Sequence, residues 1–462
     1  MNKVFTIFLF VLVSILAYSQ DVVVTGIANG QADKLVRIIV YADQFSGLER
    51  TIAETKTNEL GEFTMRFMVE ETQFAYLAFG LEKGEFYLSP GATYNFNIIT
   101  DTTSGSKSIF DRTPLNFILD ADDGGVQNSI EEFNFKYNNF IYDNVKSIYK
   151  SKDKSVVTKF VSDMRNEYAN NNSGYVKNYV EYSLVSLLWL SRKESNSKIL
   201  ENYIDNKPVL YSNIQYTEFF KEFFKNYFES EKPYTYSELI LAINNPEHSI
   251  LSDLLSRTEQ LANDNRVREI VEMLLLERNY HNRDVNKKSV IIKLNEIVTV
   301  SKYIENKEIA KNFIIELQEM QNGSPSPKVT LINNEGDTIS LDDFSGKFVL
   351  LSFVKPNCKI CNFQMQLLSD IKKELNNEFE IITIVAGNNM DDVIDFAKER
   401  GYNWPILKTG NDIIIFEDYN IIVYPSYILI NPNSTVAYAH LPMPEENMKL
   451  YIQRFMDGYK AK

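Results

Sequence analysis

Short runs of β-branched and aromatic residues dominate the first hundred positions of the chain, and turn-forming residues separate them. Asn29-Gly30 and Ser89-Pro90-Gly91 are clear turn signals between two such runs. Strands that return at such short intervals are typical of a small β-sandwich. The pattern therefore predicts an all-β domain over residues 20–104. The runs that we interpret as strands lie at residues 22–24, 36–41, 63–67, 74–79 and 94–99.

The apolar residues change to a helical spacing after this domain. Ile130, Phe133 and Tyr137, for example, recur at intervals of three and four residues, which places them on one face of an α-helix. Breakers such as Pro246 interrupt the spacing at intervals. The pattern predicts an all-α region over residues 105–322, with roughly eight helices.

The last part of the chain alternates between strands and helices. It begins at a cluster of Gly, Ser and Pro at residues 323–327, and residues 348–354 then form an almost continuous apolar run. Such a run is the pattern of a strand buried on both faces. A helical spacing follows at once, and the residues expected on its apolar face are Ile360, Phe363, Leu367, Ile371 and Leu375.

Further strands and helices follow this first pair, and together they predict an α/β domain over residues 323–462. The expected strands are residues 380–386, 405–407, 426–430 and 435–439, and the expected helices are residues 390–400 and 445–456. The whole chain is therefore predicted to be multidomain, with a small all-β N-terminal sandwich, an all-α middle region and an α/β C-terminal domain.

The chain contains two cysteines, and only two residues separate them. Cys358 and Cys361 stand where the apolar strand gives way to the helix. A disulfide across so small a loop constrains an unfolded chain little, so we expect the pair to be reactive. The first turn of a helix lowers the pKa of a thiol. Cys358 is the expected nucleophile and Cys361 the expected resolving thiol, and Lys355 and Lys359 add positive charge beside the nucleophile.

A zinc site is the main alternative for a Cys-x-x-Cys pair. Structural zinc needs two more cysteine or histidine ligands. The sequence has no other cysteine, and its histidines, His248, His281 and His440, are scattered. We therefore expect neither a metal nor another cofactor.

Pro425 stands directly before a strand of the buried type, at residues 426–430. A trans proline at such a position would cost the sheet a ladder hydrogen bond. We therefore expect a cis peptide bond between Tyr424 and Pro425.

The charge of the chain excludes some classes of partner. It carries 48 Lys and Arg against 62 Asp and Glu, a formal net charge of −14. Binding to nucleic acid or to an anionic membrane needs clustered Lys and Arg. We therefore expect no nucleic-acid partner.

The first residues have the pattern of a secretory signal peptide. Lys3 supplies the positive charge, residues 4–17 are largely apolar, and Ala17 and Ser19 are small residues at the positions that a signal peptidase requires. As a helix the apolar run would be about 21 Å long, short of a hydrocarbon core of about 30 Å. We therefore predict that residues 1–19 are a signal peptide, which is cleaved on export to the periplasm. We also predict that the mature chain has no transmembrane segment.

Residues 323–457 resemble the TlpA/ResA-type periplasmic thioredoxins. The motifs that carry this resemblance are the cluster at residues 323–327, the segment 343–351, the cysteine pair and the segment 424–432. Residues 57–63 and 87–91 loosely resemble the β-sandwich module that often precedes thioredoxin domains in envelope proteins.

The resemblance implies a thioredoxin-like fold and a thiol–disulfide oxidoreductase of the disulfide reductase type. Its substrates would be disulfides of client proteins in the envelope, and its electrons would come from a membrane-derived thiol donor. In this family the proline is cis and its loop lies against the cysteine pair. Tyr424 and Pro425 would then bind the substrate, with backbone groups of Tyr424 facing the client peptide.

Three positions depart from the family pattern. Asn357 replaces the usual Trp before the first cysteine, Ser352 stands where polar or acidic residues are common, and Gln364 replaces an acid three residues after the second cysteine. Such an acid can act as a general base on the resolving thiol. Without it, deprotonation of Cys361 is expected to be slow.

Three functions compete on these observations. The first is a thiol–disulfide oxidoreductase, whose direction of electron flow the sequence leaves open. The second is an envelope binding or scaffold protein with a regulatory or vestigial thioredoxin module, because about 300 residues carry no visible chemistry. The third is peroxide reduction, which favours Thr or Ser at the position that Lys355 occupies.

Overall fold

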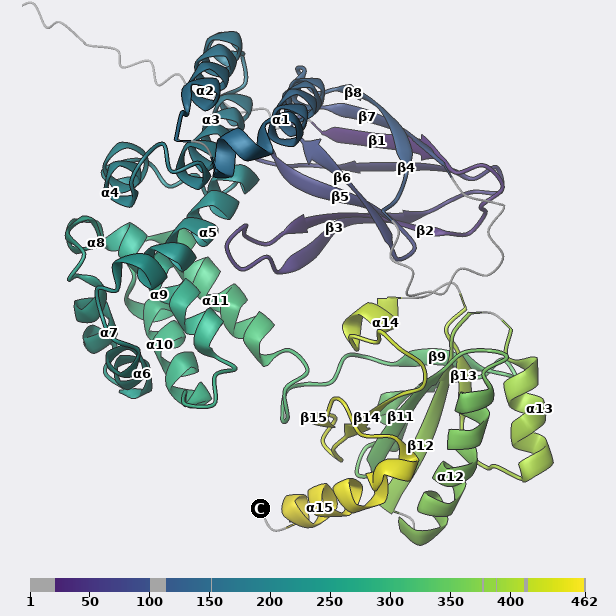
Figure 1. The fold of residues 1–462 in the computed structure, drawn as a ribbon. Coiled ribbons are helices and arrows are strands. Elements are labelled where there is room, and N and C mark those ends of the chain that lie inside the picture. The colour runs from purple at the N-terminus through teal and green to yellow at the C-terminus, as the bar shows by residue number, and fades with distance from the viewer. Residues whose placement is uncertain are drawn as a thin grey trace, which may run out of the picture.

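The structure is a computed structural model that describes residues 21–99, 114–150, 152–375, 378–387, 389–410 and 414–460. A β-sandwich, a helical region and an α/β domain follow one another along the chain (Figure 1). The predicted signal peptide, residues 1–19, lies outside the described residues. No helix among the described residues is both long enough and apolar enough to cross a membrane.

The sandwich consists of two four-stranded sheets, with strand orders β4-β1-β7-β8 and β3-β2-β5-β6. Alternate residues of the strands face inward, as β1 shows, and the core between the sheets includes Val24, Ile38, Leu77 and Phe96. The strands are β1 (Val22–Ile27), β2 (Leu35–Tyr41), β3 (Glu49–Lys56), β4 (Glu62–Phe67), β5 (Gln73–Phe79), β6 (Glu82–Leu88), β7 (Thr93–Ile98) and β8 (Phe117–Asp122).

Strand β8 lies beyond the boundary that the sequence predicts at residue 104. It pairs antiparallel with β7, so that Leu119 lies opposite Phe96. Its residues alternate between half-buried and exposed, which is a weak pattern at the edge of a sheet. The sandwich therefore takes its last strand from the segment that the apolar spacing assigns to the helical region.

Eleven α-helices follow between residues 126 and 318, more than the roughly eight that we predicted. The surplus comes from pieces such as α4 and α8, which are too short to show a helical period. The helices are α1 (Val126–Tyr149), α2 (Ser155–Tyr168), α3 (Gly174–Leu190), α4 (Asn196–Ile199), α5 (Ile214–Glu231), α6 (Tyr236–Asn244), α7 (His248–Leu255), α8 (Glu259–Asn263), α9 (Asn265–Asn279), α10 (Lys287–Val300) and α11 (Ile304–Gln318).

The turn between β2 and β3 joins the sandwich to the helices. Phe45 at its tip is buried in the helical core, with its ring edge-on to Phe220 of α5 at 5.4 Å. Lys221 then donates from Nζ to the backbone oxygens of Gln44 and Phe45, at 2.9 and 3.1 Å. The sandwich and the helical region therefore share a hydrophobic contact in addition to their chain connection.

The C-terminal domain is built on a seven-stranded sheet in the order β10-β9-β13-β12-β11-β14-β15. Every residue of the central strand β11 is buried, as its apolar run predicts. β11 pairs parallel with β12 and antiparallel with β14. The strands are β9 (Thr330–Asn333), β10 (Thr338–Ser340), β11 (Phe348–Val354), β12 (Phe379–Val385), β13 (Ile406–Lys408), β14 (Ser426–Ile430) and β15 (Val436–Tyr438).

Helices cover both faces of this sheet. α12 (Lys359–Leu375), α13 (Asp391–Arg400) and α15 (Met448–Lys460) pack into the core on one face, and α14 (Ile414–Asp418) packs on the other. Figure 1 shows α14 on the side of the domain that is turned toward the sandwich. The arrangement is that of a thioredoxin-like domain with an additional N-terminal hairpin.

Candidate active site: a disulfide at the start of α12

The two cysteines lie where strand β11 passes into helix α12, as predicted. β11 ends at Val354, and α12 begins at Lys359. Cys358 and Cys361 form a disulfide, and the backbone N–H of Cys361 donates to Sγ of Cys358 at 3.1 Å. This N–H is one of the donors in the first turn of a helix that have no backbone acceptor within the helix. In the reduced protein it would stabilise a thiolate on Cys358 in preference to a thiol.

Cys358 is the less buried of the two cysteines. Its exposed fraction is 8%, against 1% for Cys361. A reagent or client would therefore meet Cys358 first. This order of exposure is the one expected if Cys358 is the nucleophile and Cys361 the resolving thiol, although both cysteines are largely buried.

The loop before the disulfide is held by a carboxylate that sequence reasoning missed. Asn357 has a positive φ of 55°, and its backbone N–H donates to Oδ2 of Asp392, in the first turn of α13, at 2.5 Å. Lys355 and Lys359 are exposed on either side of Cys358. The charges beside Cys358 are thus two cations and one anion, and no local sequence signal connects Asp392 to this loop.

The Tyr424–Pro425 peptide bond is cis, as predicted. The bond lies at the same edge of the sheet as the disulfide, because Ser426 pairs with Phe353 near the end of β11. Tyr424 also packs against the hydrophobic core that contains both cysteines. The structure therefore brings together the two segments that the sequence predicts to form the site.

The apolar face that we predicted for α12 is only partly correct: Ile371 and Leu375 are buried as expected, but Ile360 and Phe363 are not. Ile360 and Phe363 have exposed fractions of 60% and 50%, and the residues that face the core include Cys361, Met365 and Leu368. The buried side of the helix thus differs from the predicted one near the disulfide and coincides with it at Ile371 and Leu375. The reason is tertiary: Cys361 packs into the core, which turns Ile360 and Phe363 toward solvent.

Two apolar residues of the cis-proline loop are exposed as well. Ile422 and Val423 have exposed fractions of 58% and 57%. The start of α12 and the cis-proline loop thus each have two exposed apolar side chains: Ile360 and Phe363 in the first, and Ile422 and Val423 in the second. An uncovered apolar surface at a reactive site is suited to binding a protein surface or an extended peptide.

The layer between α12 and the sheet has polar side chains without partners. Gln364 is 3% exposed, and its Oε1 accepts no hydrogen bond from another described residue. Ser352 is fully buried with its Oγ unpartnered, and Tyr427, which is opposite it on β14, has an unpartnered hydroxyl. Burial raises the pKa of Tyr427 far above its ordinary value. None of these three groups is a carboxylate that could accept a proton from Cys361 at neutral pH.

The described residues contain no group of three or more His, Cys, Asp and Glu side chains placed to hold a metal ion. The cysteine pair itself is closed as a disulfide. A disulfide can undergo thiol–disulfide exchange with a thiolate.

Comparisons with known proteins place the similarity in the C-terminal domain. Residues 322–439 match the AhpC/TSA family. Thiol-disulfide oxidoreductase ResA of Bacillus subtilis (strain 168) is 28% identical over 121 residues, which are 26% of this chain and 67% of ResA. Thioredoxin-like protein YneN of the same organism is 28% identical over 127 residues, which are 26% of this chain and 72% of YneN.

Among solved structures, the thioredoxin domain of a thiol-disulfide oxidoreductase from Bacteroides vulgatus is similar, with 25% identity and a TM-score of 0.27. The match covers 29% of this chain and 97% of that domain. The C-terminal domain is thus thioredoxin-like and is similar to thiol–disulfide oxidoreductases at modest identity. Each of these similarities covers less than a third of this chain.

Proposed function

We propose that this protein is a thiol–disulfide oxidoreductase of the cell envelope, which reduces disulfides of client proteins through Cys358 and Cys361. The Cys358 thiolate attacks one sulfur of a client disulfide, forms a mixed disulfide and releases the other client sulfur as a thiolate. The Cys361 thiolate then attacks Sγ of Cys358 and releases the second client thiol. Two electrons pass to the client, and the pair becomes the disulfide that the structure contains.

A donor must then reduce the pair again. A dithiol donor restores both thiols in the reverse sequence and is itself oxidised to a disulfide. We propose that this donor is membrane-derived, as the resemblance to TlpA/ResA-type proteins implies, and that the chain acts in the periplasm after removal of residues 1–19. Mass spectrometry of the mature N-terminus tests the export: the expected first residue is Gln20, and a mature protein that retains Met1 contradicts it.

The observation that carries the proposal is the position of Cys358. Its sulfur accepts the N–H of Cys361 in the first turn of α12, and the cis-proline loop lies at the same edge of the sheet. The first feature favours the thiolate. The second provides backbone for an extended client segment, with Tyr424 and Pro425 as the substrate-binding residues. Lys355 and Lys359 are proposed to favour the thiolate further, and Gln364 to slow the resolving step.

The decisive experiment is a trap. In Cys361→Ser, Cys358 can still attack a client disulfide, but no thiol resolves the product. The variant recovered from cells should therefore carry client proteins as adducts that disappear on reduction. Cys358→Ser is the matched control and should carry none. A Cys361→Ser protein that carries only small thiols contradicts the proposal.

A binding or scaffold function is the second candidate. It is favoured by the shared core of the sandwich and the helices, in which Phe45 is buried, because this body is far larger than disulfide exchange requires. A partner that is retained equally by wild type, Cys358→Ser and Cys361→Ser would favour it. Peroxide reduction is tested by peroxide consumption, and Lys355, at the position where that chemistry favours Thr or Ser, argues against it.

A further inference from the structure

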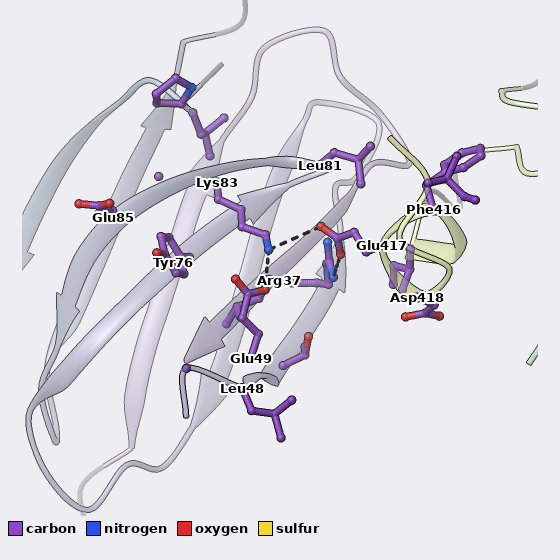
Figure 2. Close-up of a pocket in the computed structure, with 18 of the residues that line it drawn as sticks. Arg37, Leu48, Glu49, Tyr76, Leu81, Lys83, Glu85, Phe416, Glu417 and Asp418 are labelled. Carbon is purple, nitrogen blue, oxygen red and sulfur yellow. Dashed lines mark hydrogen bonds and ion pairs between the residues drawn. The ribbon is translucent and has the colours of Figure 1, made fainter. Parts of the chain in front are cut away.

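A cleft separates the sandwich from the thioredoxin-like domain. The outer face of the sheet β3-β2-β5-β6 forms one wall, and α14 lies across from it (Figure 2). The cleft has a volume of about 1060 Å³, at the upper limit of the roughly 300–1,000 Å³ of small-molecule pockets. Its size suits a segment of polypeptide.

Among the described residues that line the cleft, two are cationic, and both are already engaged. Arg37 Nη1 lies 2.9 Å from Oε2 of Glu417, and Lys83 Nζ lies 2.5 Å from Oε2 of Glu49 and 3.6 Å from Oε1 of Glu417. Figure 2 shows the two contacts of Glu417 running from the sandwich to α14, whereas the pair of Lys83 and Glu49 lies within the sandwich. The contacts of Glu417 join α14 to the sandwich, and the three ion pairs together offset the positive charges of Arg37 and Lys83.

Carboxylates without such partners also line the cleft. Glu85 and Glu319 are exposed there and form no ion pair with another described residue. Glu316 lies beside Glu319, and burial, together with Glu277 and Glu319, raises its pKa to about 7 against the opposing effect of Lys221. The surplus charge of the described residues that line the cleft is therefore negative.

The segment that follows α14 leads from this cleft to the cis-proline loop. Ile421 lines the cleft, and Pro425 follows four residues later, a distance of at most about 14 Å along an extended chain. The ring of Phe416, which also lines the cleft, packs edge-on against Tyr424 at 5.9 Å. A client chain beside the cis-proline loop would therefore reach the cleft within about four residues.

We propose that the cleft is a second client subsite, which binds a Lys- or Arg-rich segment about four to six residues from the client cysteine. The inference rests on the proposed function and names its substrate class: disulfides next to a basic segment. Cations beside the client cysteine itself are not favoured, because Lys355 and Lys359 flank Cys358 on the surface. The position of the basic residues, and not their number, is thus what the site distinguishes.

The test uses synthetic peptides whose single cysteine is joined by a disulfide to thionitrobenzoate, a coloured thiol. Three lysines are placed four to six residues from the cysteine, on its N-terminal side in one peptide and on its C-terminal side in another. Two further peptides carry the lysines directly beside the cysteine or glutamines in their place. The full mature chain is reduced and freed of reductant, and release of thionitrobenzoate gives a second-order rate constant for each peptide.

One of the two peptides with distant lysines should react about 10-fold faster than the glutamine peptide at low salt. This is the size of effect that two or three partly exposed ion pairs produce. The advantage should fall at high salt. The double variant Glu85→Gln/Glu319→Gln should lose it and still react normally with the glutamine peptide. Glu399→Gln, an exposed carboxylate of α13 outside the cleft, should retain it.

The outcomes separate the two proposals. If the glutamine peptide reacts no faster with wild type than with Cys358→Ser, the proposed function fails, and the subsite fails with it. If that peptide reacts through Cys358 but distant lysines bring no advantage, only the subsite is refuted. An advantage that persists in Glu85→Gln/Glu319→Gln, or that lysines beside the cysteine bring equally, also refutes it.

Discussion

Replacing Gln364 by Glu tests whether the missing base limits the redox pair. Gln364 lies three residues after Cys361 on α12, a spacing that puts two Cβ atoms about 5–6 Å apart. The side chain is 3% exposed, and its Oε1 has no partner among the described residues. Glu has the same shape as Gln, so Gln364→Glu changes the chemistry with little change in packing.

The burial of this position sets the size of the effect. A well-placed general base contributes about 10²–10⁴-fold when it is ionised. Burial raises the pKa of a carboxyl, to about 8–9 in fully buried glutamates. With a pKa of about 8, roughly one tenth of the introduced carboxyl is ionised at pH 7. We therefore expect Gln364→Glu to accelerate the resolving step by about 10–10³-fold at pH 7 and by more above pH 8.

Ionisation of the introduced carboxyl must also change the free energy of unfolding with pH. A buried carboxyl with a raised pKa binds more protons in the folded than in the unfolded protein. The stability of Gln364→Glu relative to wild type should therefore fall as pH rises from about 4.3 to the raised pKa and stay constant above it. Urea unfolding at several pH values measures this.

The assay is single-turnover reduction of a small aromatic disulfide between pH 6 and 9, with Gln364→Leu as a buried control that adds no base. The rate of Gln364→Glu should rise with pH at the pKa that the stability measurements give. If stability shows the ionisation and the rate does not, the carboxylate forms but does not accept the proton of Cys361. The absence of an acid at this position would then not limit the proposed exchange reaction.

Three further predictions follow from named contacts. Phe45→Ala should lower the free energy of unfolding by about 3–5 kcal/mol. Phe135→Ala, at a side chain that is 71% exposed, should change it by less than about 0.5 kcal/mol. Similar urea midpoints for the two variants would contradict the buried position of Phe45. Burial and two neighbouring glutamates raise the pKa of Glu316 to about 7, so the folded protein loses stability from this group as pH rises from about 4.5 to 7. Glu316→Gln should therefore raise Tm at pH 8 and leave it unchanged near pH 4.5. A gain in Tm that is equal at both pH values would exclude the raised pKa as the cause. In the reduced protein, alkylation followed by peptide mass spectrometry should modify Cys358 before Cys361 and at a pH below the ordinary thiol pKa of about 8.5; faster modification of Cys361 would reverse the assigned roles.

The sequence alone determined the features that depend on neighbouring residues. The run at residues 348–354 had to be a buried strand because it has no polar side for water. The change to helical spacing then placed Cys358 and Cys361 at a helix start, and Pro425 before a strand predicted the cis bond. Each of these inferences needs only the chemistry of a few consecutive residues, and the structure confirms all three.

Tertiary packing decided which way the elements face and what they touch. Periodicity identifies α12 as a helix, but its apolar residues lie on more than one side, so only the packing shows that Ile360 and Phe363 are exposed at the disulfide. The burial of Phe45 in the helical core and the ion pair between Arg37 and Glu417 join residues far apart in the chain. Such contacts leave no local pattern, because a single turn residue or a single charge is compatible with solvent as well as with a distant partner. The cleft between the sandwich and α14 is likewise decided by tertiary structure, because residues far apart in the chain form its walls.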